Sequence, residues 1–176
     1  ALALALALAW FGALGQRKLV KPDEGRYGEI PREMAASGDW LTPRLNGLKY
    51  FEKPPLQYWA TAAAFEAFGS NEWTARLWTT LTGFLTVLVV WWAGRRWFGP
   101  AAGLAAALVL IGNIYFVIGG HVSTLDMGLS FFTTLILVGF CGAMSATAPR
   151  ERFALLMLMW AAMALATLSK GLIGIA

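Results

Sequence analysis

Residues 72–97, EWTARLWTTLTGFLTVLVVWWAGRRW, form one long stretch that is dominated by apolar side chains. A helix needs about 20 predominantly apolar residues to cross the hydrocarbon core of a bilayer, so this stretch predicts a membrane-spanning helix. Its end carries Trp91, Trp92 and Trp97 beside Arg95 and Arg96, a combination typical of the boundary between membrane and water. The stretch therefore indicates an integral membrane protein.

Similar apolar stretches lie on both sides of it, at residues 1–15, 100–119, 127–148 and 153–168. Gly99 and Pro100 separate two of them, because Gly commonly ends a helix and Pro commonly begins one. Together the stretches predict an all-α bundle of about five spans, with residues 16–71 as a polar loop after the first. Since the chain begins and ends inside apolar stretches, we expect it to be the N-terminal part of a longer protein.

The composition supports this class and excludes others. Hydrophobic residues make up 58% of the chain and charged residues 14%, and the mean hydropathy is +0.59. The net charge of +4 is spread without a basic stripe, so we expect membrane lipids and not nucleic acid as partners. Cys141 is the single cysteine, which excludes a disulfide within the chain, and we interpret it as a small buried hydrophobe.

The short loops predict the orientation in the membrane. Arg95 and Arg96 in one turn, and Arg150 and Arg152 in another, lie on one side, whereas the turn near His121 on the other side carries neither Lys nor Arg. Basic loops stay in the cytoplasm, so residues 16–71 should lie outside. That loop has eight Lys plus Arg in residues 16–57, but six acidic residues alternate with them, which favours a folded external element.

The polar loop carries clear local signals. Asp23 is a candidate cap for a helix from about residue 24 to residue 36, with Gly38 as its end, and Pro31 should interrupt or kink this helix. Asn46-Gly47 between short apolar stretches predicts a β-hairpin. Pro54-Pro55 should start a second helix over residues 56–68, lying in the plane of the membrane interface or forming a re-entrant segment.

Several ionisable side chains gather near the predicted outer surface. Asp23 and Glu24 follow the first span directly, and Asp126 stands at the outer end of the fourth. Ionisable groups at such depth commonly face a cavity, although Asp23 and Asp126 could also act only as helix caps.

Candidate phosphate ligands and a histidine lie nearby. Lys53 stands between Glu52 and two prolines, where its ammonium could bind a phosphate or remain a solvated loop charge. Lys170 at the outer end of the fifth span could bind an anion or extend toward the interface. His121 precedes Asp126 by five residues, and a structural role is an alternative to a functional one.

Two strings carry a resemblance to a known family: DEGRYGEI at residues 23–30 and GDWLTPRLNGLKYFEKPPLQYW at residues 38–59. They resemble the bacterial lipid A aminoarabinose transferases, polyprenyl-phosphate-dependent glycosyltransferases of the GT-C fold. The resemblance implies a multi-pass protein of the bacterial inner membrane with its active site facing the periplasm. The implied reaction moves 4-amino-4-deoxy-L-arabinose from undecaprenyl phosphate to phosphate groups of lipid A. It also implies further spans and a periplasmic domain beyond residue 176, without which this chain should be inactive.

The resemblance assigns roles to particular residues. Asp23 and Asp126 are the implied catalytic carboxylates, and the implied substrate-binding residues are Lys53, Tyr50, Glu52, Glu24, His121 and Lys170. Lys53 would bind the donor phosphate. Related enzymes sometimes use a divalent metal, Zn²⁺ or Mg²⁺/Mn²⁺, for which Glu52 is the candidate ligand, although the sequence has no motif with recognised metal-ligand spacing.

Other functions stay open from the residues alone. A related glycosyltransferase that acts on protein or on another glycolipid would share much of the polar loop. A membrane transporter or scaffold subunit is an alternative of a different class. A transporter should place ionisable residues near mid-span, whereas here they gather at one surface.

Overall fold

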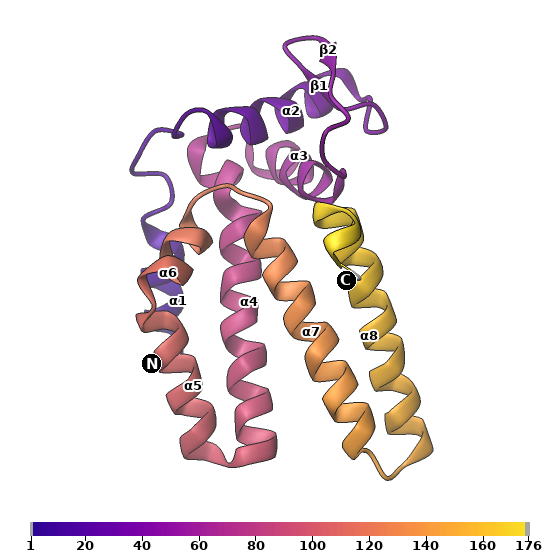
Figure 1. Cartoon of the computed structure of the whole chain (residues 1–176). Helices are drawn as coiled ribbons and strands as arrows, with labels where there is room; N and C mark the ends of the chain where they lie inside the picture. Colours follow the sequence, from indigo (N-terminus) through magenta and orange to yellow (C-terminus); the bar gives the residue numbers. More distant parts are fainter. Residues whose placement is uncertain (1, 175–176) are drawn as a thin grey trace.

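Helices dominate residues 2–174, which are the residues that the computed structural model describes. Figure 1 shows long helices running side by side, with a smaller group of elements lying across one end. The long helices and their continuation are α4 (Glu72–Phe98), α5 (Pro100–Gly112), α6 (Ile114–His121), α7 (Asp126–Ser145), α8 (Pro149–Lys170) and the short 3-10 helix η1 (Leu172–Gly174). The elements across the end are α2 (Asp23–Ser37), β1 (Arg44–Leu45), β2 (Leu48–Lys49) and α3 (Leu56–Phe68).

Within residues 2–174, three helices are long and apolar enough to cross a membrane, namely α4, α7 and α8. The turns from α4 to α5 and from α7 to α8 lie together at the end opposite α2 and α3 (Figure 1). The two arginine-bearing turns therefore share one side, as the orientation argument assumed.

The span predicted over residues 100–119 is broken. Helices α5 and α6 meet at Asn113 with a bend of 68°, and only as a pair do they meet the length and composition expected of a crossing. Asn113 has an extended backbone, and its side chain accepts a hydrogen bond from the Phe116 amide at 3.1 Å, which caps α6. Thr80 on α4 donates to the Gly120 carbonyl at 2.7 Å and holds α6 in this direction. The predicted span over residues 100–119 is therefore formed by two helices that meet at an angle.

The first predicted span is described as α1 (Leu2–Gly12), 11 residues long and packed against α4. At about 1.5 Å per residue this helix is shorter than the hydrocarbon core of a bilayer. Within residues 2–174, three helices, or four with the bent pair, are long and apolar enough to cross a membrane, and α1 is the remaining predicted span.

Helix α2 runs from Asp23 to Ser37 and ends at Gly38, whose positive φ of 72° suits glycine, as predicted. Two other expectations for this helix were wrong. Asp23 is its first residue and pairs with Arg26 instead of capping the helix. The helix also continues through the buried Pro31 without the predicted interruption, and its neighbours Ile30 and Met34 belong to the core shared with α3.

The predicted hairpin and second helix are both present. Strands β1 and β2 pair antiparallel around Asn46 and Gly47, with φ values of 53° and 78° that a tight hairpin turn requires. Helix α3 begins at Leu56 directly after Pro54-Pro55. It packs between α2 and α4 across the end of the bundle (Figure 1).

A compact apolar core joins α2 and α3 to the start of α7. It consists of Tyr27, Ile30, Met34, Tyr58, Ala62 and Leu125. Because Leu125 directly precedes Asp126, this core fixes the polar loop against the end of α7.

Cys141 is exposed on α7, which corrects its interpretation as a buried residue. The buried residues of this part of α7 include Val138, Gly139 and Ala143. Two positions along a helix from Gly139 turn a side chain to the other face, so Cys141 points away from the packed side.

Candidate functional site

A cluster of polar side chains joins the start of α2 to the segment between β2 and α3. Arg26 contacts Asp23 at 3.0 Å and donates to the Tyr50 hydroxyl at 2.9 Å. The Tyr50 hydroxyl in turn donates to Glu52 at 2.6 Å, and Lys53 lies 3.5 Å from the other oxygen of Glu52. We call Asp23, Arg26, Tyr50, Glu52 and Lys53 the loop cluster. It brings together four of the residues that the sequence singled out.

The loop cluster is open to solvent and stays charged. The Asp23 and Glu52 side chains are 55% and 53% exposed. The hydrogen bond from Tyr50, aided by nearby Lys53 and Arg26, lowers the pKa of Glu52. Burial and the bond to Glu52 raise the pKa of Tyr50, so its hydroxyl keeps its proton and donates. The cluster thus offers carboxylates and cations side by side at neutral pH.

Asp126 and Lys170 form an ion pair between the first residue of α7 and the last of α8. The sequence singled out both residues, but did not indicate that they contact each other, 44 positions apart. Asp126 does not cap α7, because the residue at the cap position is Leu125. The Asp126 carboxylate instead accepts a hydrogen bond from Lys170.

One cavity connects these two groups of residues. Its volume is about 440 Å³, and both Lys53 and Lys170 line it, together with Leu41, Pro43, Phe51, Glu52, Pro54, Pro55 and Gly171. Lys53 and Lys170, which come from distant parts of the chain, thus line the same cavity together with the apolar rings of Phe51 and the prolines. Such a lining suits an anionic group that is attached to an apolar body.

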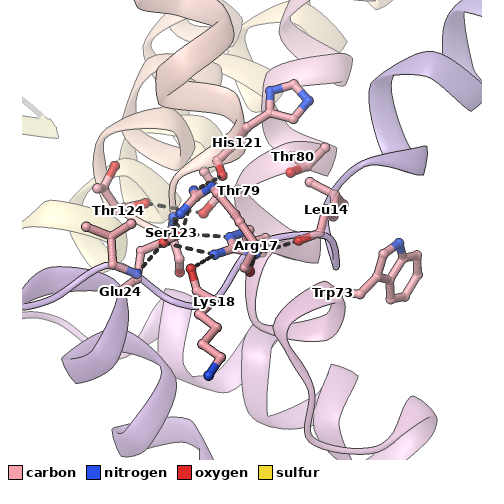
Figure 2. A network of polar contacts seen from close by, with 12 residues as sticks. Leu14, Arg17, Lys18, Glu24, Trp73, Thr79, Thr80, His121, Ser123 and Thr124 are labelled. Carbon is pink, nitrogen blue, oxygen red and sulfur yellow. Dashed lines mark hydrogen bonds and ion pairs between the residues drawn. The ribbon is translucent and has the colours of Figure 1, made fainter.

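Glu24 belongs to a different, buried network. Its carboxylate is completely buried and accepts hydrogen bonds from the side chains of Arg76 and Arg17 and from the backbone amides of Val20 and Ser123. Figure 2 shows Arg17, Glu24 and Ser123 drawn together between the chain ahead of α2 and the loop ahead of α7. Burial alone would raise the pKa of Glu24, but the bonds from Arg76, Arg17, Ser123 and Val20 lower it to about 2. Substrate binding by Glu24 stays a prediction, and the structure shows protein donors around both of its oxygens.

Arg76 is the other half of this network. Its Nε and Nη2 donate to the two Glu24 oxygens at 2.8 and 3.0 Å, and its remaining N–H groups donate to the carbonyls of Leu14, Arg17 and Lys18. The side chain is only 1% exposed. A buried charge needs this degree of pairing to be tolerated.

His121 is held by the backbone. Its Nδ1 lies 2.7 Å from the Val117 carbonyl and its Nε2 lies 2.9 Å from the Trp10 carbonyl, while its own carbonyl accepts from Arg17. The ring also packs edge-on against Trp10. These contacts join α1 to α6 and support the structural role that the sequence left open, while substrate binding by His121 stays a prediction.

The described residues do not complete a metal site around Glu52. Within residues 2–174, His, Cys, Asp and Glu side chains do not form a group of three or more that could hold a metal ion. Glu52 is paired with Arg26 and Lys53, two cations that compete with a metal for its oxygens. Glu52 as a metal ligand stays a prediction.

Sequence reasoning missed two arginines. Arg26 could have been found from its spacing, because residues three apart on a helix are neighbours and Asp23 precedes it at that distance. Arg76 is the fifth residue of the apolar stretch 72–97, where a charge is costly and needs a partner.

The chain is similar to known proteins along its length. The family model for dolichyl-phosphate-mannose-protein mannosyltransferases matches residues 1–176. Over 176 residues the chain is 32% identical to an undecaprenyl phosphate-alpha-4-amino-4-deoxy-L-arabinose arabinosyl transferase from Edwardsiella ictaluri, covering 99% of this chain and 32% of the relative. Over 138 residues it is 39% identical to a protein of the same name from Pseudomonas savastanoi pv. phaseolicola, covering 77% of this chain and 26% of the relative. The chain thus spans about a third or less of the length of these relatives.

Solved structures show the same arrangement. Crystal structures of ArnT from Cupriavidus metallidurans, one in the apo state and one bound to undecaprenyl phosphate, match with a TM-score of 0.94 and 45% identity. Each match covers 99% of this chain and about a third of the solved chain. This similarity confirms the predicted multi-span helical fold of the GT-C type.

Proposed function

Because the chain belongs to the dolichyl-phosphate-mannose-protein mannosyltransferase family, we propose that it is part of a membrane glycosyltransferase that uses undecaprenyl phosphate as sugar carrier. The sugar is 4-amino-4-deoxy-L-arabinose and the acceptors are phosphate groups of lipid A. The names of relatives that are 30–39% identical support this choice and confirm the resemblance seen in residues 23–30 and 38–59.

The observation that carries the proposal is the cavity lined by Lys53 and Lys170. A polyprenyl phosphate presents an anionic phosphate on an apolar chain, and the cavity is lined by two lysines, each beside a carboxylate, and by apolar side chains. A solved relative, 45% identical, is described as bound to undecaprenyl phosphate. The match in chemistry supports Lys53 as the donor-phosphate ligand, with Lys170 as a second positive charge at the edge.

The proposed roles follow from the charge that develops during transfer. The bond between the sugar and the departing phosphate breaks through a state with positive charge on the sugar and growing negative charge on the phosphate. Lys53 stabilises the phosphate, and Asp23 at the opposite end of the loop cluster faces the sugar or orients the acceptor. A phosphate acceptor is already ionised, so the reaction does not need a strong base.

The proposed setting is the inner membrane of a bacterium. The protein is an integral membrane protein, and the arginines in the turns after α4 and α7 favour the cytoplasm for that end of the bundle. The loop cluster and the cavity lie at the other end, which we assign to the periplasm, where lipid A is reached. A protein acceptor with a mannosyl donor is the second candidate, since the matching family model is named for that reaction.

The test replaces Lys53 by alanine in the full-length protein. Lys49 is a matched control, because it is an exposed lysine on β2 of the same loop outside the cavity lining. Membranes that contain each variant are supplied with undecaprenyl-phosphate-linked aminoarabinose, and mass spectrometry follows the addition of the sugar to lipid A.

The expected result is loss of transfer in Lys53→Ala with wild-type transfer in Lys49→Ala. Retained transfer in Lys53→Ala, or near-normal polymyxin resistance in cells that carry it, would overturn the assignment of the phosphate site. Transfer of mannose to protein by the wild type, with no change in lipid A, would favour the second candidate.

A further inference from the structure

The buried Glu24 carboxylate joins the two segments that carry Asp23 and Asp126. Glu24 directly follows Asp23 at the start of α2. Its Oε1 accepts from the backbone amide of Ser123 at 2.9 Å, and Ser123 stands three residues ahead of Asp126 in the loop that leads into α7. One carboxylate therefore contacts the backbone near both predicted catalytic residues, which are 103 positions apart in the sequence.

Arg76 extends this connection to a third segment. From α4 it binds both oxygens of Glu24, and it also donates to the carbonyls of Arg17 at 2.9 Å and Lys18 at 3.0 Å, in the chain that leads into α2. Helix α4 thus holds the chain ahead of α2 through Arg76, and Glu24 links that chain to the loop ahead of α7 through Ser123.

The exposed ion pairs of Asp23 and Asp126 do not by themselves fix the distance between these two carboxylates. Asp23 and Asp126 are 55% and 63% exposed, and each contacts a cation, Arg26 or Lys170, that is itself partly exposed. Exposed ion pairs hold a geometry only weakly. The distance between the two carboxylates therefore depends on the buried contacts beneath them.

We propose that the Glu24–Arg76 pair is a positioning device that sets Asp23 and Asp126 relative to each other without touching the substrate. The inference rests on the proposed function for its catalytic meaning. The pair acts through backbone contacts, so its loss should lower the rate of the chemical step more than it lowers donor binding. A displacement of about 1 Å in a reacting group can cost about 10²-fold in rate.

The first test measures kcat and KM for the donor in full-length Glu24→Asp and Arg76→Lys. Aspartate is one methylene shorter and withdraws its oxygens from Ser123, while lysine keeps the charge of Arg76 but lacks the planar set of five donors. We expect kcat to fall by about 10- to 100-fold in both variants, without a comparable change in KM.

Thr80→Val is the control for a general loss of stability. Thr80 is buried on the same helix as Arg76 and donates to the Gly120 carbonyl at 2.7 Å, so valine removes a buried interhelical hydrogen bond that involves neither Glu24 nor Arg76. We expect this variant to unfold at a lower temperature and to keep its kcat.

A second test does not depend on activity, and it separates this inference from the proposed function. Spin labels at the exposed positions Lys21 and Ser130, introduced as Lys21→Cys and Ser130→Cys with Cys141→Ser, report the distance between the starts of α2 and α7. We expect the distance distribution to broaden or shift in Glu24→Asp and Arg76→Lys and to stay as in the wild type in Thr80→Val.

An unchanged kcat and an unchanged label distance in Glu24→Asp and Arg76→Lys would overturn the inference, and so would an equal loss of kcat in Thr80→Val.

If both variants fail to fold, Arg17→Ala decides, because Arg17 is partly exposed and donates to both Glu24 oxygens. Wild-type kcat and label distance in Arg17→Ala would then leave the pair with a purely structural role and refute the proposal. A wild type without transfer but with the expected label distances would refute the proposed function alone.

Discussion

Replacing Glu24 by glutamine should be far more destabilising than the same change at Glu29 on the same helix. Glu24→Gln leaves the Arg76 guanidinium, 1% exposed, without a countercharge. Breaking a buried ion pair in this way typically costs about 3–5 kcal/mol. Glu29 pairs with Arg32 at 2.7 Å on the helix surface, and such a neighbouring pair stabilises a helix by about 0.2–0.5 kcal/mol. We therefore expect a difference of about 3 kcal/mol or more between the two variants.

The contribution of the Glu24 charge to the free energy of unfolding should also depend on pH. Its pKa is lowered from the ordinary 4.5 to about 2, because the hydrogen bonds from Arg76, Arg17, Ser123 and Val20 outweigh the effect of burial. A lowered pKa in the folded state means that the stabilisation is present above pH 4.5 and is lost as the pH falls toward 2. The lowered pKa corresponds to a stabilisation by the ionised carboxylate on the order of 3 kcal/mol, similar to the typical cost of breaking a buried ion pair.

The measurement is reversible unfolding of the full-length protein in mixed detergent micelles, followed by tryptophan fluorescence. The free energy of unfolding is compared for the wild type, Glu24→Gln and Glu29→Gln at neutral pH, and then for the wild type and Glu24→Gln between pH 5 and pH 2. The wild type should lose stability over that range more steeply than Glu24→Gln. Equal losses in Glu24→Gln and Glu29→Gln at neutral pH, or parallel pH profiles, would refute the reasoning.

Three further predictions follow from particular positions. Asp23→Asn should lower kcat by about 10²-fold or more if Asp23 acts on the reacting groups, whereas Glu29→Gln, which breaks a similarly spaced ion pair on α2, should keep wild-type kcat in the same transfer assay. Gly47→Ala should destabilise the protein by about 1 kcal/mol because φ is 78° there, whereas Gly25→Ala inside α2 should stabilise it by about 0.5–1 kcal/mol in the same unfolding measurement. A cysteine placed at the exposed Ser37 should react with a membrane-impermeant thiol reagent in cells with a permeable outer membrane, and protection there would overturn the assigned orientation.

Local chemistry was readable from the sequence. The apolar stretches predicted α4, α7 and α8, and the residues around Gly38, Asn46-Gly47 and Pro54-Pro55 predicted the end of α2, the hairpin and the start of α3. These features depend on residues within a few positions of one another. Glycine adopts positive φ values that other residues rarely adopt, and proline fixes its own φ and lacks a backbone donor. The family resemblance likewise rested on two contiguous strings.

Long-range contacts decided the rest. Pro31 was expected to interrupt or kink its helix, but the helix continues through it, and its neighbours Ile30 and Met34 pack against α3. The apolar stretch after Pro100 gave no sign of its bend, which the local cap at Asn113 and the hydrogen bond from Thr80 on α4 accompany. In both cases a contact with another helix contributes what the local sequence does not indicate.

The same division applies to the site. The opening stretch, residues 72–97, determined by its apolar character that the chain crosses a membrane, and the charges of residues 23–59 determined which surface to search. Only the tertiary structure decided that Glu24 is enclosed by Arg76 from that stretch, and that Lys53 and Lys170 line one cavity. A carboxylate serves as ligand or as buried anchor according to the donors around it, and here those donors come from residues 52 and 99 positions away.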